Sequence, residues 1–336
     1  MAKIGMIGAG SWGVALAWLL DNNGHEVTVW SALASEIDML DRDREHKDKL
    51  PGVRLSERMK FTKQLEEAVK DMDLLAMAVP SIFTRKTARQ MKELVAEGQI
   101  IVNVAKGIEE DTLKTLDVQI AEEIPQADIA VLSGPTHAEE VGRGLPTTIV
   151  AAAKKKKTAE YVQSIFSSPV FRVYTSPDVL GVELGAALKN VVALAAGMAD
   201  GIGYGDNTKA ALITRGLKEI SVLGVKMGGA PETFAGLTGM GDLIVTCASM
   251  HSRNRRAGIL IGQGKKMKEA MDEVKMVVEG VYSAKAGLEL ARKYDVEMPI
   301  VEQVNKILFE DKPVKEAVNE LMLRELKSEH QLPWEE

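Results

Sequence analysis

The sequence predicts a protein of two domains, an N-terminal α/β domain with a mainly parallel sheet and an all-α C-terminal domain. Three observations predict this fold class. Short apolar runs alternate with amphipathic segments through the first half of the chain, a glycine-rich turn joins the first run to the first amphipathic segment, and beyond Pro177 only helical periodicity is left. We expect the two domains to be residues 1–177 and 178–336.

Apolar runs such as LLAMAV and QIIVNVA in the first half are typical of strands that are covered on both faces. The expected strands are Lys3–Ile7, Glu26–Trp30, Leu74–Val79, Gln99–Ala105, Ile129–Leu132 and Thr147–Ala152, with a helix over Ser11–Asn22. In the second half, Asp178 is a suitable N-cap for a long helix. The helices expected there are Val179–Met198, Thr208–Leu223, Arg255–Gly262, Ser283–Tyr294 and Ile300–Phe309.

Bulk properties narrow the class of protein. The 336 residues carry a net charge of −6, which argues against nucleic acid or an anionic membrane as the main partner. The one cysteine, Cys247, forms no internal disulfide and is expected to be a small buried apolar residue. The longest apolar stretch, residues 179–202, is interrupted by Glu183 and Lys189, so we expect a buried helix and not a membrane span. A cytoplasmic protein without a metal site is the default expectation.

Gly8, Gly10 and Gly13 form a GxGxxG motif that follows a strand and opens a helix. This is the context in which the motif indicates a Rossmann-like dinucleotide-binding domain. The first glycine allows the tight turn, the second lets the backbone approach the pyrophosphate, and the third lets the helix pack on the sheet. The helix N-terminus then offers free N–H groups to the phosphates.

The end of the second strand does not decide between NAD and NADP. A domain that binds only NAD often has Asp or Glu there, whereas this chain has Trp30-Ser31-Ala32-Leu33. Ser31 is able to bond either a 2′-hydroxyl or a 2′-phosphate, and no arginine follows it. The cofactor choice stays open.

Ligands of open α/β sheets gather beyond the carboxyl ends of the strands. Lys106 lies there beside a glycine and suits a ligand anion, although it is equally a residue type found in solvent. Pro80-Ser81 and the segment Ser133-Gly134-Pro135-Thr136 lie at the ends of other strands, where they either shape turns or contact ligand.

The helical domain contains polar residues in apolar surroundings. Lys189 and Asn190 lie within GVELGAALKNVVALAAG, and Lys189 is either a proton donor with a lowered pKa or a lysine whose amine reaches solvent at a helix edge. Asp242, in a glycine-flanked turn, either pairs with such a lysine or caps a helix. Ser252 and Arg253, at the start of the next helix, suit a phosphate.

At this point the motifs match a known family. The chain resembles the bacterial NAD(P)-dependent glycerol-3-phosphate dehydrogenases over essentially its full length. The motifs that carry the resemblance are GAGSWG at 8–13, NVAKGIE at 103–109, SGPTHAEEVGRGLPT at 133–147, GVELGAALKNVVALAAG at 181–197, GDNTKAALITRGL at 205–217, TFAGLTGMGDLIVTC at 233–247, SRNRR at 252–256 and VVEGVYSA at 277–284.

The resemblance implies reversible hydride transfer between a nicotinamide and C2 of dihydroxyacetone phosphate, giving sn-glycerol 3-phosphate for glycerophospholipid synthesis. It implies that Lys189 is the proton donor and acceptor, supported by Asp242 and Thr246. Substrate contacts are implied for Lys106, Gly134, Thr136, Lys189, Asn190, Asp242, Ser252, Arg253 and Asn254. Cofactor contacts are implied for Gly8, Gly10, Ser11, Trp12, Gly13, Ser31, Lys106, Ala138, Arg253, Val277 and Glu279. Family members are cytoplasmic and commonly homodimers.

One departure from the family and two rival interpretations bear on this assignment. Many members carry a basic residue just after the position of Ser31, where this chain has Ala32 and Leu33. Related β-hydroxyacid and sugar-acid dehydrogenases set the lysine and an asparagine one helical turn apart, whereas Lys189 and Asn190 are adjacent. A non-catalytic NAD(P) sensor would not need the lysines and Asp242 together.

Overall fold

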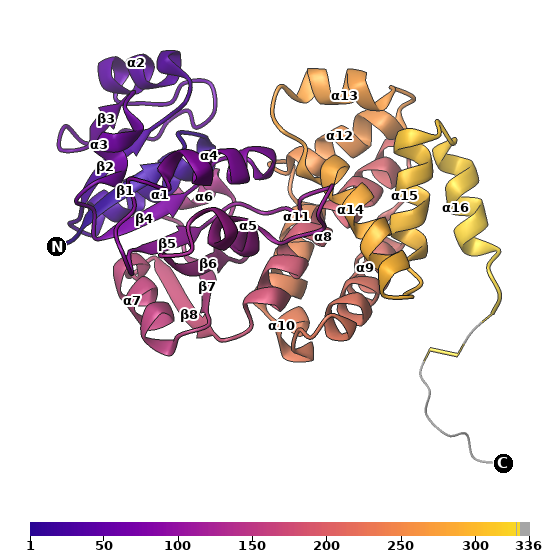
Figure 1. Cartoon of the computed structure of the whole chain (residues 1–336). Helices are drawn as coiled ribbons and strands as arrows, with labels where there is room; N and C mark the ends of the chain where they lie inside the picture. The colour runs from indigo at the N-terminus through magenta and orange to yellow at the C-terminus, as the bar shows by residue number, and fades with distance from the viewer. Residues whose placement is uncertain (327, 330–336) are drawn as a thin grey trace.

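The computed structural model describes residues 1–326 and 328–329 and shows an α/β lobe joined to a helical lobe (Figure 1). Within this part of the chain, eight strands form one sheet in the order β3-β2-β1-β4-β5-β6-β7-β8. Neighbouring strands are parallel except β6 and β7, which are antiparallel. The strands are β1 (Lys3–Ile7), β2 (Glu26–Trp30), β3 (Lys60–Thr62), β4 (Leu74–Met77), β5 (Ile100–Asn103), β6 (Asp128–Ser133), β7 (Thr147–Ala153) and β8 (Phe171–Ser176).

Helices cover both faces of the sheet, as expected for a parallel sheet with buried strands. Buried residues of α1, α6 and α7 pack on one face, and those of α3, α4 and α5 pack on the other. The helices of this lobe are α1 (Ser11–Asn22), α2 (Ala34–Asp43), α3 (Leu65–Val69), the 3₁₀ turn η1 (Ser81–Phe83), α4 (Thr84–Met91), α5 (Leu116–Glu123), α6 (Ala138–Val141) and α7 (Lys156–Phe166).

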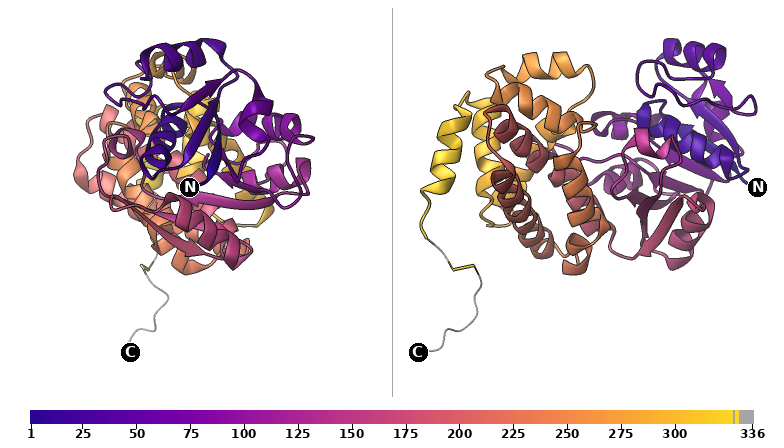
Figure 2. Two further views of the ribbon diagram at one scale, coloured as in Figure 1. Left: turned by 90° about the vertical axis from the view of Figure 1, so that its left-hand side faces the viewer. Right: turned by 180° about the vertical axis from the view of Figure 1, so that it is seen from behind.

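Helix α8 is the centre of the second lobe and begins directly after β8 (Figure 2). The side chain of Asp178 accepts the N–H of Gly181 at 2.8 Å, which confirms the expected N-cap. The helices of this lobe are α8 (Val179–Gly201), α9 (Asp206–Lys226), α10 (Pro231–Ala235), the π-helical turn η2 (Leu237–Gly241), α11 (Asp242–Ala248), α12 (Arg253–Gly262), α13 (Met267–Val274), α14 (Glu279–Lys293), α15 (Pro299–Phe309) and α16 (Val314–Met322).

Helix α8 is long and apolar enough to cross a membrane, but 89% of its most apolar window is buried inside the protein. It packs against α9, α11, α12, α14 and α15. The expectation of a buried core helix is therefore confirmed.

The predicted fold class is confirmed. The structure differs in the bounds of several elements, such as α14, which begins at Glu279, in helices that were not expected, such as α2 and α16, and in short or edge strands. The strand β3 has only three residues, too few to produce a recognisable pattern. The strand β8 lies at the edge of the sheet and was not predicted. Its residues alternate between buried and exposed, so a period of two in the sequence is the pattern that would have indicated it. The antiparallel register of β7 was not predicted, because an apolar run does not encode the direction of its neighbour.

Candidate active site

The turn between β1 and α1 has the shape that a dinucleotide requires. Gly8 has a φ of +121°, and a Cβ built on Gly13 would lie 2.1 Å from the carbonyl oxygen of Gly8. A Cβ on Gly10, by contrast, would meet nothing within 4 Å. Gly10 is the N-cap of α1 and has no side chain to cap it, so no N-cap side chain occupies the first N–H groups of the helix. The residues present therefore fit a bound pyrophosphate.

The ends of the neighbouring strands close around this turn. The backbone N–H of Gly8 donates to the carbonyl oxygen of Trp30 at 2.9 Å, which brings the end of β2 against the turn. The indole Nε1 of Trp12 donates to the carbonyl oxygen of Val104 at 3.1 Å, beyond the end of β5. Ser11, the first residue of α1, is buried.

The strand β2 has no acidic residue at its end, but Glu36 on α2 lies beside Ser31 there. The hydroxyl of Ser31 donates to Oε2 of Glu36 at 2.6 Å, and Glu36 also pairs with Lys49. The sequence pattern predicts such an acid at the end of the second strand itself, and Glu36 lies five residues beyond Ser31. The available signal was its position in the first turn of the following helix, which faces back toward the strand.

Asp242 lies between two lysines from different lobes. Its Oδ1 is 2.8 Å from Nζ of Lys189 on α8, and its Oδ2 is 2.5 Å from Nζ of Lys106 beyond β5. Lys189 also donates to Oγ1 of Thr246 at 2.6 Å, and Thr246 donates to the carbonyl oxygen of Asp242 at 2.6 Å. The structure thus brings together four residues from three widely separated parts of the sequence. With two ammonium groups and one carboxylate, the cluster carries net positive charge suited to an anionic substrate.

Burial and neighbouring charges set the pKa values of the cluster. Burial lowers the pKa of Lys189 to about 8, against the opposing effect of Asp242, and the charge of Lys106 lowers it further. Burial alone would raise the pKa of Asp242, but the charges of Lys106 and Lys189 outweigh it and lower that pKa. Asp242 therefore stays ionised, while Lys189 is able to change protonation state near neutral pH.

Two residues that were expected to contact substrate, Gly134 and Thr136, lie just beyond β6. The carbonyl oxygen of Gly134 accepts Nζ of Lys106 at 3.0 Å and Oγ1 of Thr136 at 3.1 Å. Ala138 follows as the buried first residue of α6.

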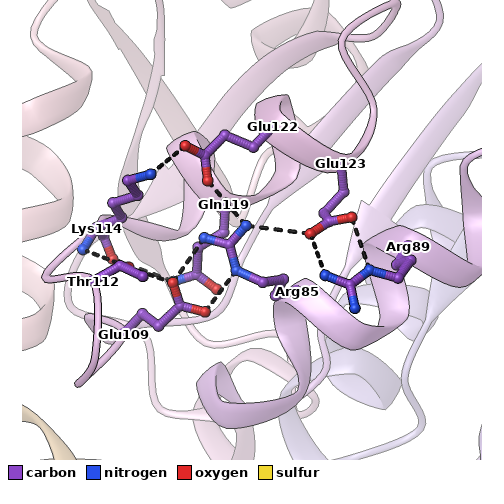
Figure 3. A network of polar contacts seen from close by, with 8 residues as sticks. All are labelled: Arg85, Arg89, Glu109, Thr112, Lys114, Gln119, Glu122 and Glu123. Carbon is purple, nitrogen blue, oxygen red and sulfur yellow. Dashed lines mark hydrogen bonds and ion pairs between the residues drawn. The ribbon is translucent and has the colours of Figure 1, made fainter.

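A network of ion pairs holds the loop that follows Lys106 (Figure 3). Arg85 on α4 binds both carboxylate oxygens of Glu109 at 2.7 Å. Arg85 also pairs with Glu122 and Glu123 at the end of α5, and Arg89 pairs with Glu123. The sequence did not indicate this network, because its members come from two helices and a loop.

A second polar chain joins α8, α12 and α14. Nδ2 of Asn254 donates to Oδ1 of Asn190 at 2.9 Å, and Oδ1 of Asn254 accepts the backbone N–H of Gly280 at 2.8 Å. Next to Gly280, the carboxylate of Glu279 accepts the backbone N–H of Ser81 at 3.1 Å and also its hydroxyl. Ser81 follows β4, where the sequence allows either a turn or a ligand contact. In the structure both its backbone N–H and its hydroxyl bond Glu279. Val277 is half-buried two residues before Glu279.

The arginines of α12 divide into two groups. Arg255 binds Asp200 at 2.7 Å and therefore ties α12 to α8. Arg253 has no ion-pair partner within 4.0 Å among the residues that the structure describes, and burial lowers the pKa of its guanidinium. The Nε of Arg256 is buried without a hydrogen-bond partner in the same described ranges. Ser252 is the N-cap of α12 and accepts the N–H of Arg255 at 3.2 Å.

Neither Cys247 nor a cluster of metal-ligating side chains forms a second candidate site in the described part of the chain. Cys247 is buried, as expected, and burial raises the pKa of its thiol to about 12. Within residues 1–326 and 328–329, no group of three or more His, Cys, Asp or Glu side chains lies close enough to hold a metal ion. A surface hollow of about 760 Å³ lies at the amino ends of β1 and β2, opposite the edge that carries the glycine turn and Lys106.

Comparison with known proteins agrees with this geometry. The sequence profile of the NAD-dependent glycerol-3-phosphate dehydrogenase N-terminus matches residues 3–159, and that of the C-terminus matches residues 178–319. The chain is 66% identical over 335 residues to a glycerol-3-phosphate dehydrogenase [NAD(P)+] of Agathobacter rectalis, covering 99% of this chain and 100% of that protein. It is 52% identical over 327 residues to the enzyme of that name from Bacillus subtilis, covering 96% of this chain and 95% of that protein.

A solved structure shows the same likeness. The crystal structure of glycerol-3-phosphate dehydrogenase from Coxiella burnetii superposes with a TM-score of 0.93 at 36% identity, covering 96% of this chain and 99% of that one.

Proposed function

The chain belongs to the family of NAD-dependent glycerol-3-phosphate dehydrogenases, and from that premise we propose how its residues carry out the reaction. It is an NAD(P)-dependent oxidoreductase that interconverts dihydroxyacetone phosphate and sn-glycerol 3-phosphate. The product is the backbone of glycerophospholipids. The observation that carries the residue assignment is Asp242 between Lys106 and Lys189, because it places a titratable ammonium in a buried, positively charged cluster.

The dinucleotide would be held by the glycine turn and the residues around it. Gly8, Gly10 and Gly13 shape the turn, the start of α1 at Ser11 and Trp12 offers N–H groups, and the other contacts come from further along the chain. Those other proposed contacts are Ser31, Lys106, Ala138, Arg253, Val277 and Glu279. When bound, the nicotinamide donates a hydride to C2 of the ketone or accepts one from the alcohol.

Lys189 supplies the proton that the reduction needs. As charge develops on the carbonyl oxygen at C2, the Lys189 ammonium donates a proton to that oxygen and becomes a neutral amine. Asp242 and Thr246 orient the amine. Burial lowers its pKa to about 8, so the free-energy cost of the proton transfer is small near neutral pH. In the reverse direction the neutral amine takes the proton from the alcohol.

The remaining residues hold the substrate. Gly134 and Thr136 lie beside Lys106 of the lysine cluster, and together with Lys106 they would contact the glycerol oxygens. Arg253 at the start of α12 carries a guanidinium without a partner in the described ranges, and with Ser252 and Asn254 it would bind the phosphate. Asn190 follows Lys189 on α8 and accepts a hydrogen bond from Asn254 on α12, so it links the lysine cluster to the proposed phosphate site.

A substrate comparison tests this function. Oxidation of NADH and of NADPH is followed by absorbance with dihydroxyacetone phosphate and with unphosphorylated dihydroxyacetone. We expect kcat/KM for the phosphorylated ketone to be about 1,000-fold higher, because Arg253 binds the phosphate through charge-assisted bonds. Equal rates with both ketones would contradict the phosphate site, and no oxidation with either would contradict the activity.

We also propose that the protein is a cytoplasmic homodimer, without nucleic-acid partners or stable membrane association. This proposal rests on the family resemblance and on the net charge of −6. Light scattering on the purified chain should give twice the monomer mass. A monomer at micromolar concentration would contradict it.

A further inference from the structure

Ser31 lies where dinucleotide-binding folds contact the ribose of the adenosine half. It follows Trp30, whose carbonyl oxygen accepts the N–H of Gly8 at 2.9 Å, so the end of β2 borders the glycine turn. NAD carries a hydroxyl at the 2′ position of this ribose, and NADP carries a phosphate. The groups around Ser31 therefore bear on the choice between the two dinucleotides.

The Ser31 hydroxyl already donates its one proton in a hydrogen bond within the protein. The hydroxyl donates to Oε2 of Glu36 at 2.6 Å and accepts the backbone N–H of Leu33 at 3.1 Å. A hydroxyl has one proton and two lone pairs, so Ser31 keeps a single acceptor position for a ligand. A ribose 2′-hydroxyl is able to donate to that position, whereas a fully ionised 2′-phosphate has no proton to give.

Glu36 adds negative charge behind Ser31. Burial alone would raise the pKa of Glu36, but its contacts with His46, Lys49 and Ser31 outweigh burial and hold the pKa at about 2. Glu36 is therefore a carboxylate at neutral pH. Because Lys49 already compensates this charge, the pair offers no free positive charge to a second anion that approaches Ser31.

Two lysines at this edge of the sheet are already paired with carboxylates of α2. Lys49 binds Glu36, and Nζ of Lys63 is 2.5 Å from Oδ1 of Asp38. Lys63 lies at this edge because its carbonyl oxygen accepts Nε1 of Trp30 at 3.2 Å. A 2′-phosphate would therefore have to compete with these carboxylates for a counter-charge.

We propose that Ser31 and Glu36 form a ribose-selection pair that makes this chain prefer NAD(H) to NADP(H). The inference rests on the dinucleotide site of the proposed function and deepens it. It agrees with the absence of a basic side chain at Ala32 and Leu33, where a 2′-phosphate would need one.

The test measures binding without substrate. NADH and NADPH are titrated into the full chain by calorimetry, and the wild-type Kd for NADH is expected to be about tenfold lower than that for NADPH. Glu36→Gln removes the charge, releases Lys49 and lets the Ser31 hydroxyl turn outward. In that variant we expect the Kd for NADPH to fall about tenfold, while the Kd for NADH changes less than about threefold. Equal wild-type affinities, or an unchanged ratio in Glu36→Gln, would overturn the proposal.

Two further variants keep the test decisive. Glu66→Gln is the matched control, because Glu66 is likewise a glutamate paired with a lysine, Lys70, but is exposed on α3; it should change neither affinity. Ser31→Ala should weaken NADH by about fivefold and leave NADPH unchanged, which tests the pair even if Glu36→Gln does not fold. A wild-type chain that bound neither dinucleotide would contradict the proposed function too. A chain that showed the selection but did not reduce dihydroxyacetone phosphate would contradict only the proposed function.

Discussion

At the scale of single residues, the proposed chemistry depends on the shared carboxylate of Asp242. It is the oppositely charged partner of both Lys106 and Lys189, and all three side chains are largely buried. Removing Asp242 would leave two buried ammonium groups without a counter-charge, whereas removing either lysine leaves Asp242 paired with the other, so the effects of substitutions on the two lysines will not be additive.

Lys189→Ala should lower kcat for dihydroxyacetone phosphate reduction by about 1,000-fold, because the variant loses its proton donor. Circular dichroism and the melting temperature should stay close to wild type, and both are measured alongside the rate. Near-normal turnover in Lys189→Ala would remove this residue from the proposed role.

The pH dependence follows from the protonation state of Lys189. Its pKa is lowered to about 8, so the ammonium that reduction requires is present below pH 8 and is lost as the pH rises through that value. The reduction rate should therefore fall above about pH 8, and the oxidation rate should rise there. Asp242→Asn removes the charge that favours the ammonium, so both inflections should move to lower pH. Inflections that stayed in place would show that another group titrates.

Arg253→Ala should raise KM for dihydroxyacetone phosphate by about 100-fold, because charge-assisted bonds to the phosphate are lost. Steady-state kinetics measure the effect. Arg54→Ala is the control, since Arg54 is an exposed arginine near Glu57 on the first lobe and should leave KM unchanged. An unaltered KM in Arg253→Ala would place the phosphate elsewhere.

At the scale of elements, the glycines of the β1–α1 turn have different tasks: Gly13 is needed for folding and Gly10 for the proposed dinucleotide binding. Gly13 is needed for packing, since its Cβ would lie 2.1 Å from a carbonyl oxygen, whereas the Cβ of Gly10 would enter open space. Gly10 has a φ of −66°, which alanine adopts without strain.

Gly10→Ala should therefore keep the stability of the wild type but weaken NADH binding by about tenfold or more, because the added methyl occupies the approach of the pyrophosphate. Calorimetric titration and a melting curve measure the two quantities. Gly205→Ala, at the start of α9, also adds a methyl in open space and should leave binding unchanged. Unaltered binding in Gly10→Ala would move the pyrophosphate away from this turn.

At the scale of the whole molecule, buried carboxyl groups tie helices together and make stability depend on pH. The carboxyl of Glu219 on α9 accepts the backbone N–H of Ile300 at 2.9 Å, at the start of α15. Burial raises the pKa of Glu219 to about 7 from 4.5. A group whose folded pKa is raised contributes stability below its unfolded pKa and loses it as the pH rises through the folded pKa.

The contribution of Glu219 should thus be lost between pH 4.5 and about 7, by about 3 kcal/mol in the free energy of unfolding. Urea denaturation of the wild type and of Glu219→Gln across this range measures the difference. The gap between the two proteins should change with pH in this window, whereas Glu302→Gln, an exposed glutamate on α15, should track the wild type. A pH-independent gap for Glu219→Gln would contradict the linkage.

Some elements were predictable from sequence and others were not, for physical reasons. The long helix α8 and the buried strands β4 and β5 carry apolar runs whose length and periodicity are local properties. The strand β8 was missed because its alternation is short and lies at the edge of the sheet. The antiparallel pairing of β7 depends on hydrogen bonds to β6 and on no feature of β7 alone.

The sequence by itself determined the two-domain fold class, the glycine turn and the helix that begins after Asp178, because each depends on backbone conformations and periodicities within a few residues. Only the tertiary structure decided that Lys106, Lys189 and Asp242 meet and that Glu279 bonds Ser81. In the two clusters that join the lobes, the partners are separated by dozens to nearly two hundred residues. Their contact is set by how strands and helices pack, and packing leaves no local mark on either partner.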